Sequence, residues 1–402
     1  MKFTSCLFIF FATCYSSPHV LFCFIIGRYE SKLIKEIIDH IVKRLKPKLL
    51  PVEEHIVGMD FRLKELKSLL NVHLDDIRMV GIYGPSGIGK TTTAKMVYND
   101  ILCQFNGGSF LEDVKSRSKC DNDGFQLLQE LLRGILVGEN VELNNISDGI
   151  KMIKDRLGSE KVFVVIDDVD DSEQVKSLVK SCKWFGQGSR IILTTRYKHL
   201  LDVYRVDESY EAKVLCNEEA IQLFSWHAFK QNIPKEDYVD MSNLMVDYVQ
   251  GLPLAIKVLG SFLYGMTIDE WKSTSGKLTK EGQEIYNVLK ICYDGLDDNE
   301  KEILLDIACF FKGEDKDFVL RILKSCDFYA EIGVRVLCDR CLISISNNMI
   351  SMHDLIQQMG WTIVRGKSRK DPSKWSRLWD PDDIRRAFLG EKVRIKFMNL
   401  II

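Results

Sequence analysis

The sequence predicts an α/β fold that begins with a parallel sheet covered by helices and continues into a helical bundle and a smaller domain of three helices and a hairpin. Three observations support this prediction. Apolar strand segments alternate with helical segments between about residues 56 and 210, as in parallel sheets. Helical periodicity replaces the strand pattern beyond Tyr210. Two short strands then flank Asn347-Asn348.

Length, charge and cysteine content narrow the class of protein. The chain has 402 residues, enough for two to four domains of about 100 to 200 residues each. The chain has 55 Lys and Arg and 57 Asp and Glu, which give a formal net charge of -2. Its overall electrostatic field therefore does not favour the binding of nucleic acid. The 12 Cys are scattered, which favours reduced thiols in a cytoplasmic protein.

The N-terminal region divides into two predicted segments. Residues 1–27 are apolar, with no charged side chain between Phe3 and Ile26, so they resemble a signal peptide or membrane anchor. Because the polar run Ser16–His19 interrupts them, a wrongly assigned or vestigial start is the favoured interpretation, and membrane association through residues 3–26 is the alternative. Residues 28–55 predict an amphipathic linker helix, with apolar residues at helical spacing up to Leu45.

Residues 56–210 predict the sheet domain. Met79–Tyr83 and Arg190–Thr194 are short apolar strands, and Lys161–Asp168 contains an uninterrupted apolar run typical of a central parallel strand. A helix is expected from Thr91 to about Asp100.

Residues 211–286 predict a helical bundle. Asn217 is expected to cap one helix, and a later helix stops at Gly251 before another begins at Pro253. In residues 287–385, three helices precede two short strands joined by Asn347-Asn348, whose residues tolerate the positive φ of a tight turn. Three helices and a hairpin predict a winged-helix domain, and residues 386–402 form a tail. The three helices are expected around Asn299–Phe311, Phe318–Lys324 and Gly333–Arg340, and the strands at Leu342–Ser346 and Met349–Met352.

The segment Gly84–Thr91 has the spacing of a P-loop, between an apolar strand and a helix. The glycines let backbone N–H groups curl around phosphate oxygens, and the helix directs its positive end at the same anion. Lys90 is expected to reach the β- and γ-phosphates, and Thr91 to place its hydroxyl on Mg²⁺. The fold class is therefore a P-loop NTPase parallel sheet followed by a helical bundle and a winged-helix domain.

Charged residues follow two of the predicted strands. Asp167 and Asp168 end one strand, where ligands bind in open parallel sheets. Asp167 is expected to help hold Mg²⁺, and Asp168 to orient the attacking water. Arg196 follows another strand and could meet the γ-phosphate, although a surface position is an equally simple interpretation.

Several motifs occur in an order that matches one family. They are Gly84–Thr92, Lys161–Asp168, Gly188–Arg196, Gly251–Ala255, Leu305–Phe311 and Met352–Asp354. Through them, residues from about Tyr29 to Trp379 resemble the NB-ARC module of plant nucleotide-binding leucine-rich-repeat disease-resistance proteins, which are STAND P-loop ATPases. The motif LDIACFF at Leu305–Phe311 and the residue Trp379 resemble those of the subclass that carries a Toll/interleukin-1-receptor (TIR) domain. Since neither that NAD hydrolase domain nor the repeats occur here, the chain resembles a truncated receptor or an incomplete gene prediction.

The resemblance assigns further roles. It implies that Pro253 packs near the adenine, that Val57 and Gly58 border the same pocket, and that His353 contacts the β-phosphate of ADP. From the residues alone, Pro253 need only start a helix and His353 need only cap one. The expected nucleotide-binding residues are Val57, Gly58, Gly84, Gly87, Ile88, Gly89, Lys90, Thr91, Thr92, Arg196, Pro253 and His353. Catalytic roles are expected for Lys90 and Asp168, and Mg²⁺ ligation for Thr91 and Asp167.

The resemblance implies a molecular switch of plant innate immunity, with ADP bound at rest and at most slow ATP hydrolysis. A conventional P-loop ATPase and a truncated decoy or adaptor are the alternatives. Besides ADP or ATP with Mg²⁺, the expected partners are further copies of the chain or full-length receptors on activation.

The sequence also contains features of two rival binding functions. A winged helix can read DNA, but acidic residues cancel the basic ones within Glu331–Arg340, so direct nucleic-acid binding is not expected. Cys338-x-x-Cys341 with His353 resembles half of a zinc site. Because a second Cys pair and a suitably spaced second His are missing, core thiols are the favoured interpretation.

Overall fold

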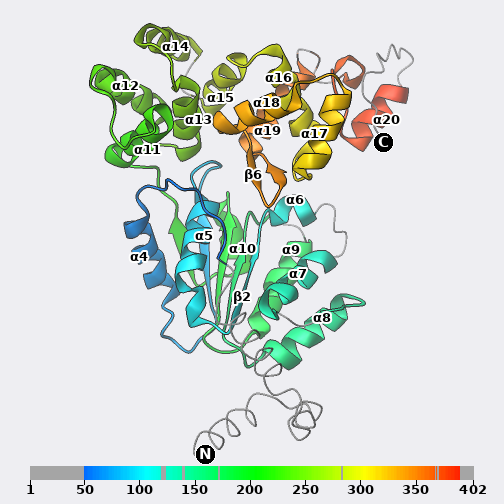
Figure 1. Ribbon diagram of the computed structural model, residues 1–402. Helices are drawn as coiled ribbons and strands as arrows, with labels where there is room; N and C mark the ends of the chain where they lie inside the picture. Colours follow the sequence, from blue (N-terminus) through cyan, green and yellow to red (C-terminus); the bar gives the residue numbers. More distant parts are fainter. Residues whose placement is uncertain are drawn as a thin grey trace, which may run out of the picture.

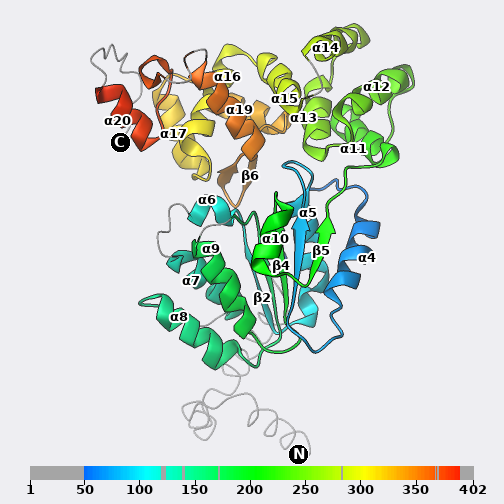
Figure 2. The ribbon, with the colours of Figure 1, turned by 180° about the vertical axis from the view of Figure 1, so that it is seen from behind.

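The computed structural model describes residues 49–118, 124–137, 141–170, 173–281, 284–366, 368 and 371–389. The hydrophobic segment 1–27, the predicted linker helix up to Leu45 and the tail beyond Leu389 lie outside the described residues. Figures 1 and 2 show two lobes, one built on a sheet and the other almost wholly helical. Within the described residues, every helix is too short or too polar to cross a bilayer.

A parallel sheet of five strands forms the core of the first lobe. The strand order is β2-β3-β4-β1-β5, with β1 carrying the P-loop at its carboxyl end. Pairing of Val80 with Ile192 and of Val165 with the same Ile192 aligns the carboxyl ends of β1, β3 and β4. The strands are β1 Arg78–Tyr83, β2 Gly107–Leu111, β3 Val162–Ile166, β4 Arg190–Thr195 and β5 Glu208–Glu211.

Helices bury both faces of this sheet. Alternate strand residues point to opposite sides, so Val80 packs with α4 and α5, whereas Met79 packs with helices on the other face. The helices of this lobe are α4 Met59–Leu70, α5 Lys90–Ile101, α6 Val114–Ser118, α7 Phe125–Ile135, α8 Ile146–Met152, α9 Glu173–Ser181 and α10 Lys198–Tyr204.

The second lobe has one continuous hydrophobic core that extends from Leu215 to Val364. Trp271 is completely buried there and packs edge-on against Phe224. The first helices of the lobe are α11 Asn217–Phe229, α12 Val239–Val249, α13 Pro253–Leu263, α14 Ile268–Glu281 and α15 Ile285–Asp294. Since the bundle and the following domain share a core, the boundary between residues 211–286 and 287–385 stays a proposal.

The last part of the second lobe combines helices with a hairpin that projects toward α6 of the first lobe (Figures 1 and 2). Asn347 and Asn348 form the hairpin turn with φ of 50° and 63°, as predicted from the sequence. The elements are α16 Asp298–Asp306, the π-helical turn η5 Ile307–Phe311, α17 Lys316–Ser325, α18 Ala330–Asp339, β6 Ser344–Ser346, β7 Met349–Ser351, α19 Asp354–Arg365 and α20 Pro381–Leu389.

The predicted fold class is confirmed, with local corrections. The N-cap of α11 is Cys216 and not Asn217, because the Glu219 carboxylate accepts a hydrogen bond from the Cys216 N–H at 3.2 Å. The first hairpin strand begins at Ser344, two residues after the predicted start at Leu342. Leu342 is instead a buried core residue.

Candidate nucleotide-binding site

The P-loop lies between β1 and α5 and has the backbone geometry that its glycines allow. Gly84, Gly87 and Gly89 have φ of 150°, 81° and 94°, in the region where a Cβ atom is unfavourable. Gly89 is the N-cap of α5, so the free N–H groups at the start of this helix open into the loop. This arrangement can bind an anion through backbone donors.

Lys90 is held against the loop that it follows. Its Nζ donates to the carbonyl oxygens of Gly84 at 2.9 Å and Pro85 at 3.0 Å. Only 8% of the residue is exposed, and this burial lowers the pKa of the ammonium group, although the charge of Asp168 opposes the effect. The cation is therefore positioned at the phosphate-binding loop.

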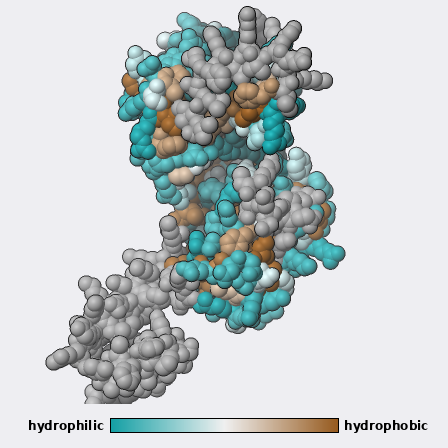
Figure 3. Space-filling model, turned by 90° about the vertical axis from the view of Figure 1, so that its right-hand side faces the viewer, coloured by the Kyte–Doolittle hydropathy of each residue, from teal (hydrophilic) through white to brown (hydrophobic). Residues whose placement is uncertain are grey.

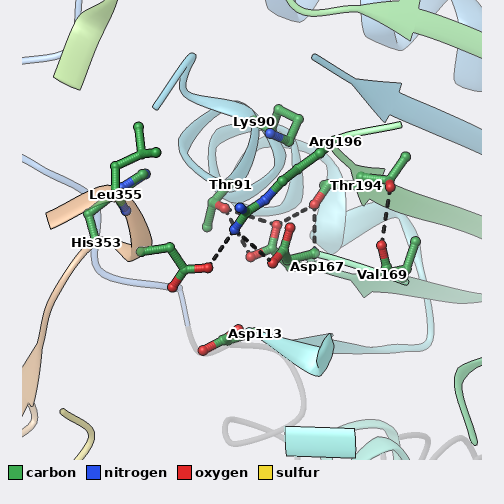
Figure 4. A network of polar contacts seen from close by, with 12 residues as sticks. Lys90, Thr91, Asp113, Asp167, Val169, Thr194, Arg196, His353 and Leu355 are labelled. Atoms are coloured by element: carbon green, nitrogen blue, oxygen red, sulfur yellow. Dashed lines mark hydrogen bonds and ion pairs between the residues drawn. The ribbon is translucent and has the colours of Figure 1, made fainter. Parts of the chain in front are cut away.

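Thr91 and Asp167 meet across the sheet edge. The Thr91 hydroxyl donates to the Asp167 carboxylate, with distances of 2.9 and 3.0 Å to its two oxygens. Thr194 of β4 donates to the same carboxylate at 2.6 Å, and its hydroxyl accepts the Asp168 N–H at 2.8 Å. Burial raises the pKa of Asp167 to about 6. Figure 4 shows these groups converging beside Lys90.

Arg196 connects the two lobes. Its Nη2 lies 2.5 Å from Asp354 Oδ2 in the helical lobe and 3.4 Å from Asp168 Oδ2 in the sheet lobe. All three side chains are mostly buried, with exposed fractions of 17% for Arg196, 22% for Asp354 and 18% for Asp168. Figure 4 shows the guanidinium group reaching over Thr91 toward the helical lobe.

His353 is the N-cap of α19, and its Nδ1 accepts a hydrogen bond from the Leu355 N–H at 3.1 Å. Because Nδ1 is an acceptor, the proton of the neutral ring is on Nε2. Burial is the main cause that lowers the pKa of His353 to about 4, and the positive charge of Arg196 adds to it. The ring is therefore neutral at physiological pH and can donate from Nε2.

A cavity of about 920 Å³ lies between the two lobes and collects most of the predicted site residues. Figure 3 shows the recess between the lobes from one side. The predicted residues that line it are Val57, Gly87, Ile88, Gly89, Lys90, Thr91, Thr92, Asp167, Asp168, Arg196, Pro253 and His353. Gly58 and Gly84 are not on its wall. The Gly58 carbonyl accepts a hydrogen bond from Arg62, and the Gly84 carbonyl accepts one from Lys90.

Val57 and Pro253 line the cavity together with further apolar and aromatic residues. Leu223 and Trp226 of α11 line it, and His55 stacks on Trp226. An apolar slot with a stacking surface suits a purine base. Lys90, Thr91 and Arg196 also line the cavity, so its lining offers both apolar and cationic groups to a nucleotide.

Sequence reasoning did not assign some residues that the structure brings into this site. Lys312 follows η5, lines the cavity and donates to Asp354 Oδ1 at 2.6 Å. Asp113 lies 3.9 Å from the Lys312 Nζ. Lys312 and Asp113 belong to no sequence motif. Their place in the site becomes visible only when the two lobes are seen packed together. Trp226 could have been suspected only as a large aromatic residue within a helix.

The structure also shows where residues of the two rival functions lie. In the part of the chain that the structure describes, no three or more His, Cys, Asp or Glu side chains gather as the ligands of one metal ion. The Cys341 thiol instead lies 3.1 Å from the Ser261 hydroxyl. Arg340, at the end of the helix that would read DNA, donates to the Phe262 carbonyl oxygen at 3.1 Å and is thus engaged within the protein.

Comparisons with known proteins agree with this site. The NB-ARC domain family matches residues 62–234, and the winged-helix domain family of Roq1-like disease-resistance proteins matches residues 297–368. Disease resistance protein RUN1 of Vitis rotundifolia is 53% identical over 90% of this chain and 27% of its own length. TMV resistance protein N of Nicotiana glutinosa is 41% identical over 87% of this chain and 31% of its own length.

Among solved structures, a Signal Transduction ATPase with Numerous Domains (STAND) with a tetratricopeptide repeat sensor, from Pyrococcus horikoshii, has a TM-score of 0.50 at 18% identity. The alignment covers 86% of this chain and 49% of that one. At this identity the likeness concerns the fold alone.

Fold and site together define a P-loop nucleotide-binding protein with a parallel sheet followed by a helical lobe. The chain carries an NB-ARC domain and a Roq1-like winged-helix domain, and its relatives are TIR-type plant disease-resistance proteins, so the resemblance recognised from the motifs is confirmed. It spans about a quarter to a third of the length of the curated relatives described above. The NB-ARC match supports nucleotide binding.

Proposed function

We propose that this chain is an ADP-holding switch in defence signalling, in which the nucleotide keeps the two lobes closed. The observation that carries the proposal is the pairing of Arg196 with Asp354 across the cavity. The same arginine follows β4 at the edge where a terminal phosphate would lie. A γ-phosphate and the Asp354 carboxylate would therefore compete for one guanidinium group, so the closed arrangement favours a diphosphate.

Binding of the diphosphate would use groups that already face the cavity. The P-loop backbone and Lys90 would hold the phosphates, and the neutral His353 ring would donate from Nε2 to the β-phosphate. The base would lie between Val57 and Pro253, near Trp226. In this arrangement the sheet lobe would hold the phosphates. The helical lobe would add contacts to the β-phosphate and to the base.

Thr91 and Asp167 fit a magnesium ion. A hydroxyl and a carboxylate are the hard oxygen donors that Mg²⁺ takes, and the two groups already lie within 3.0 Å of each other. When bound, Mg²⁺ would neutralise charge on the phosphate oxygens. Asp168 would orient a water molecule near the terminal phosphate, which supports slow hydrolysis of ATP.

Slow turnover distinguishes a switch from a conventional P-loop ATPase, the second candidate. Asp168 is tied to Arg196 in the closed form, so its carboxylate is not free to align water there. We expect low turnover with retained ADP. Sustained, fast hydrolysis by the purified chain would favour the conventional ATPase.

We further propose that the protein lies in the cytoplasm, where ATP is abundant. Its proposed partners are further copies of the chain and full-length receptors.

The proposal is tested by identifying the nucleotide that co-purifies with the full chain. Denaturation followed by ion-exchange chromatography should release ADP from the wild type and none from Lys90→Ala. The matched control is Lys151→Ala, which removes an exposed lysine at the end of α8 and should keep the nucleotide. If the wild type carries no ADP and shows no affinity for it in calorimetry, the proposed function is wrong.

A further inference from the structure

A second cation, Lys312, lies beside the contact that joins the lobes. Its Nζ donates to Asp354 Oδ1 at 2.6 Å, while Arg196 holds Oδ2 of the same carboxylate at 2.5 Å. The two oxygens are therefore divided between two cations from different lobes. A carboxylate bound at one oxygen loses rotational freedom, so the other oxygen is presented in one direction.

Lys312 is itself fixed from the interior of the helical lobe. Gln357 accepts a hydrogen bond from its Nζ at 3.2 Å and donates to the Ala308 carbonyl oxygen in η5 at 2.9 Å. Trp361 donates to the same carbonyl oxygen at 3.0 Å. Because Asp354, Gln357 and Trp361 are spaced three and seven residues apart, they share one face of α19.

Lys312 also faces the sheet lobe. Its Nζ lies 3.9 Å from Asp113 Oδ2, which follows β2, and the side chain is only 19% exposed. Burial alone would raise the pKa of Asp354, but the hydrogen bond from Lys312 and then the contact with Arg196 outweigh it and lower the pKa to about 2. Lys312 and Arg196 together therefore keep Asp354 ionised.

We infer that Lys312 is the positioning residue that orients the Asp354 carboxylate toward Arg196 and so stabilises the closed arrangement of the two lobes. The inference rests on the proposed ADP-bound resting state and adds a regulatory residue to it. Lys312 acts through Asp354. Without it, the carboxylate rotates freely, Arg196 is released toward the sheet lobe, and the cavity opens more often.

The test measures release of a fluorescent ADP analogue from the full chain after addition of excess unlabelled ADP. Lys312→Met should release the analogue about tenfold faster than the wild type, the effect of losing one charge-assisted hydrogen bond. Lys312→Arg keeps a cation and should stay close to the wild type. Lys316→Met is the matched control, because Lys316 is paired only loosely with Asp317 at 3.8 Å and should leave release unchanged.

Coupling to Asp354 separates positioning from a general loss of stability. In an Asp354→Asn background, adding Lys312→Met should cause no further acceleration, since the group on which Lys312 acts has already lost its charge. Acceleration by the same factor in both backgrounds would show that Lys312 acts by another route and would overturn the inference.

A second readout needs no nucleotide. Small-angle X-ray scattering should give a larger radius of gyration for Lys312→Met than for the wild type, and a wild-type value for Lys312→Arg. Equal radii for the wild type and Lys312→Met contradict the inference even if the chain holds ADP as proposed. A larger radius in a chain that never binds ADP would instead support the inference and refute the proposed function.

Discussion

The backbone N–H of Leu254 donates a hydrogen bond to the carbonyl oxygen of Gly87 at 3.2 Å. Leu254 is the second residue of α13, so its N–H has no partner within its own helix. The helical lobe therefore contacts the P-loop backbone directly. This contact explains how the state of the phosphate-binding loop can influence the position of the bundle without any side chain between them.

Gly87 should tolerate no side chain at this contact. Its φ is 81°, and an added Cβ would lie 3.0 Å from the Leu254 Cβ. Gly87→Ala should destabilise the protein by about 1–2 kcal/mol from the left-handed backbone alone, with crowding added, and should weaken nucleotide binding. Thermal unfolding and calorimetry with ADP check both effects.

Gly276→Ala is the control for that substitution. Gly276 lies within α14, and an added Cβ would meet open space. The control should stabilise the protein by about 0.5–1 kcal/mol, because alanine favours a helix over glycine. A Gly87→Ala protein as stable as the wild type and with normal ADP affinity would refute the close approach of the two lobes.

Replacement of Arg190, which lies away from the nucleotide site, should strongly lower the stability of the sheet lobe. The Arg190 guanidinium group is completely buried and donates to the carbonyl oxygens of Leu70, the last residue of α4, and of Asn71 and Leu74 in the following turn. Arg190→Met leaves these acceptors unsatisfied and should cost at least about 3 kcal/mol. The change is measured as a lower urea midpoint of the sheet lobe.

Arg78→Met provides a matched control, since Arg78 is the register partner of Arg190 on the neighbouring strand. Arg78 lies 3.3 Å from Asp76, a carboxylate that is 44% exposed. Loss of such a partly exposed pair should cost less than about 1 kcal/mol. Equal midpoints for the two variants would show that the buried hydrogen bonds of Arg190 are not what stabilises this corner.

Titration of the His353 ring should make the stability of the folded chain depend on pH. Burial lowers its pKa to about 4 in the folded chain from 6.5 in an exposed histidine. Between these pH values the unfolded chain binds more protons, so stability rises with pH, is fully present above pH 6.5 and is lost as the pH falls toward 4. Urea midpoints measured across this range should fall on acidification.

His353→Asn isolates the contribution of this ring. Asparagine keeps an acceptor at the N-cap of α19 but does not titrate. The variant should show a flatter dependence of the urea midpoint on pH than the wild type. An unchanged slope would assign the acid sensitivity to other groups, such as His227, whose pKa is lowered to about 3 by burial.

The sequence predicted the parts of the fold whose signals are local. β1, β3 and β4 are buried apolar runs, and each was recognised by its composition. β2 begins with Gly107 and Gly108, which hide its strand character. β5 is an edge strand in which only Tyr210 is buried, so it lacks an apolar run.

The residues of the candidate site also fall into those with a local sequence signal and those without one. Lys90 and Thr91 belong to one contiguous motif, and their positions followed from its spacing. The contact between Arg196 and Asp354 joins residues that are 158 positions apart, and no periodicity encodes such a meeting. Lys312 could not be predicted at all, because its importance depends on how α19 and η5 pack.

In the proposed switch, His353 and its neighbour Asp354 close the cavity over the nucleotide, a role that a simple nucleotide-binding domain would not require. The decisive measurement is the rate at which bound ADP leaves the wild type and His353→Ala under identical conditions. The switch proposal predicts slow release from the wild type and markedly faster release from His353→Ala, with the P-loop intact in both. Equal, slow release from the two proteins would contradict it.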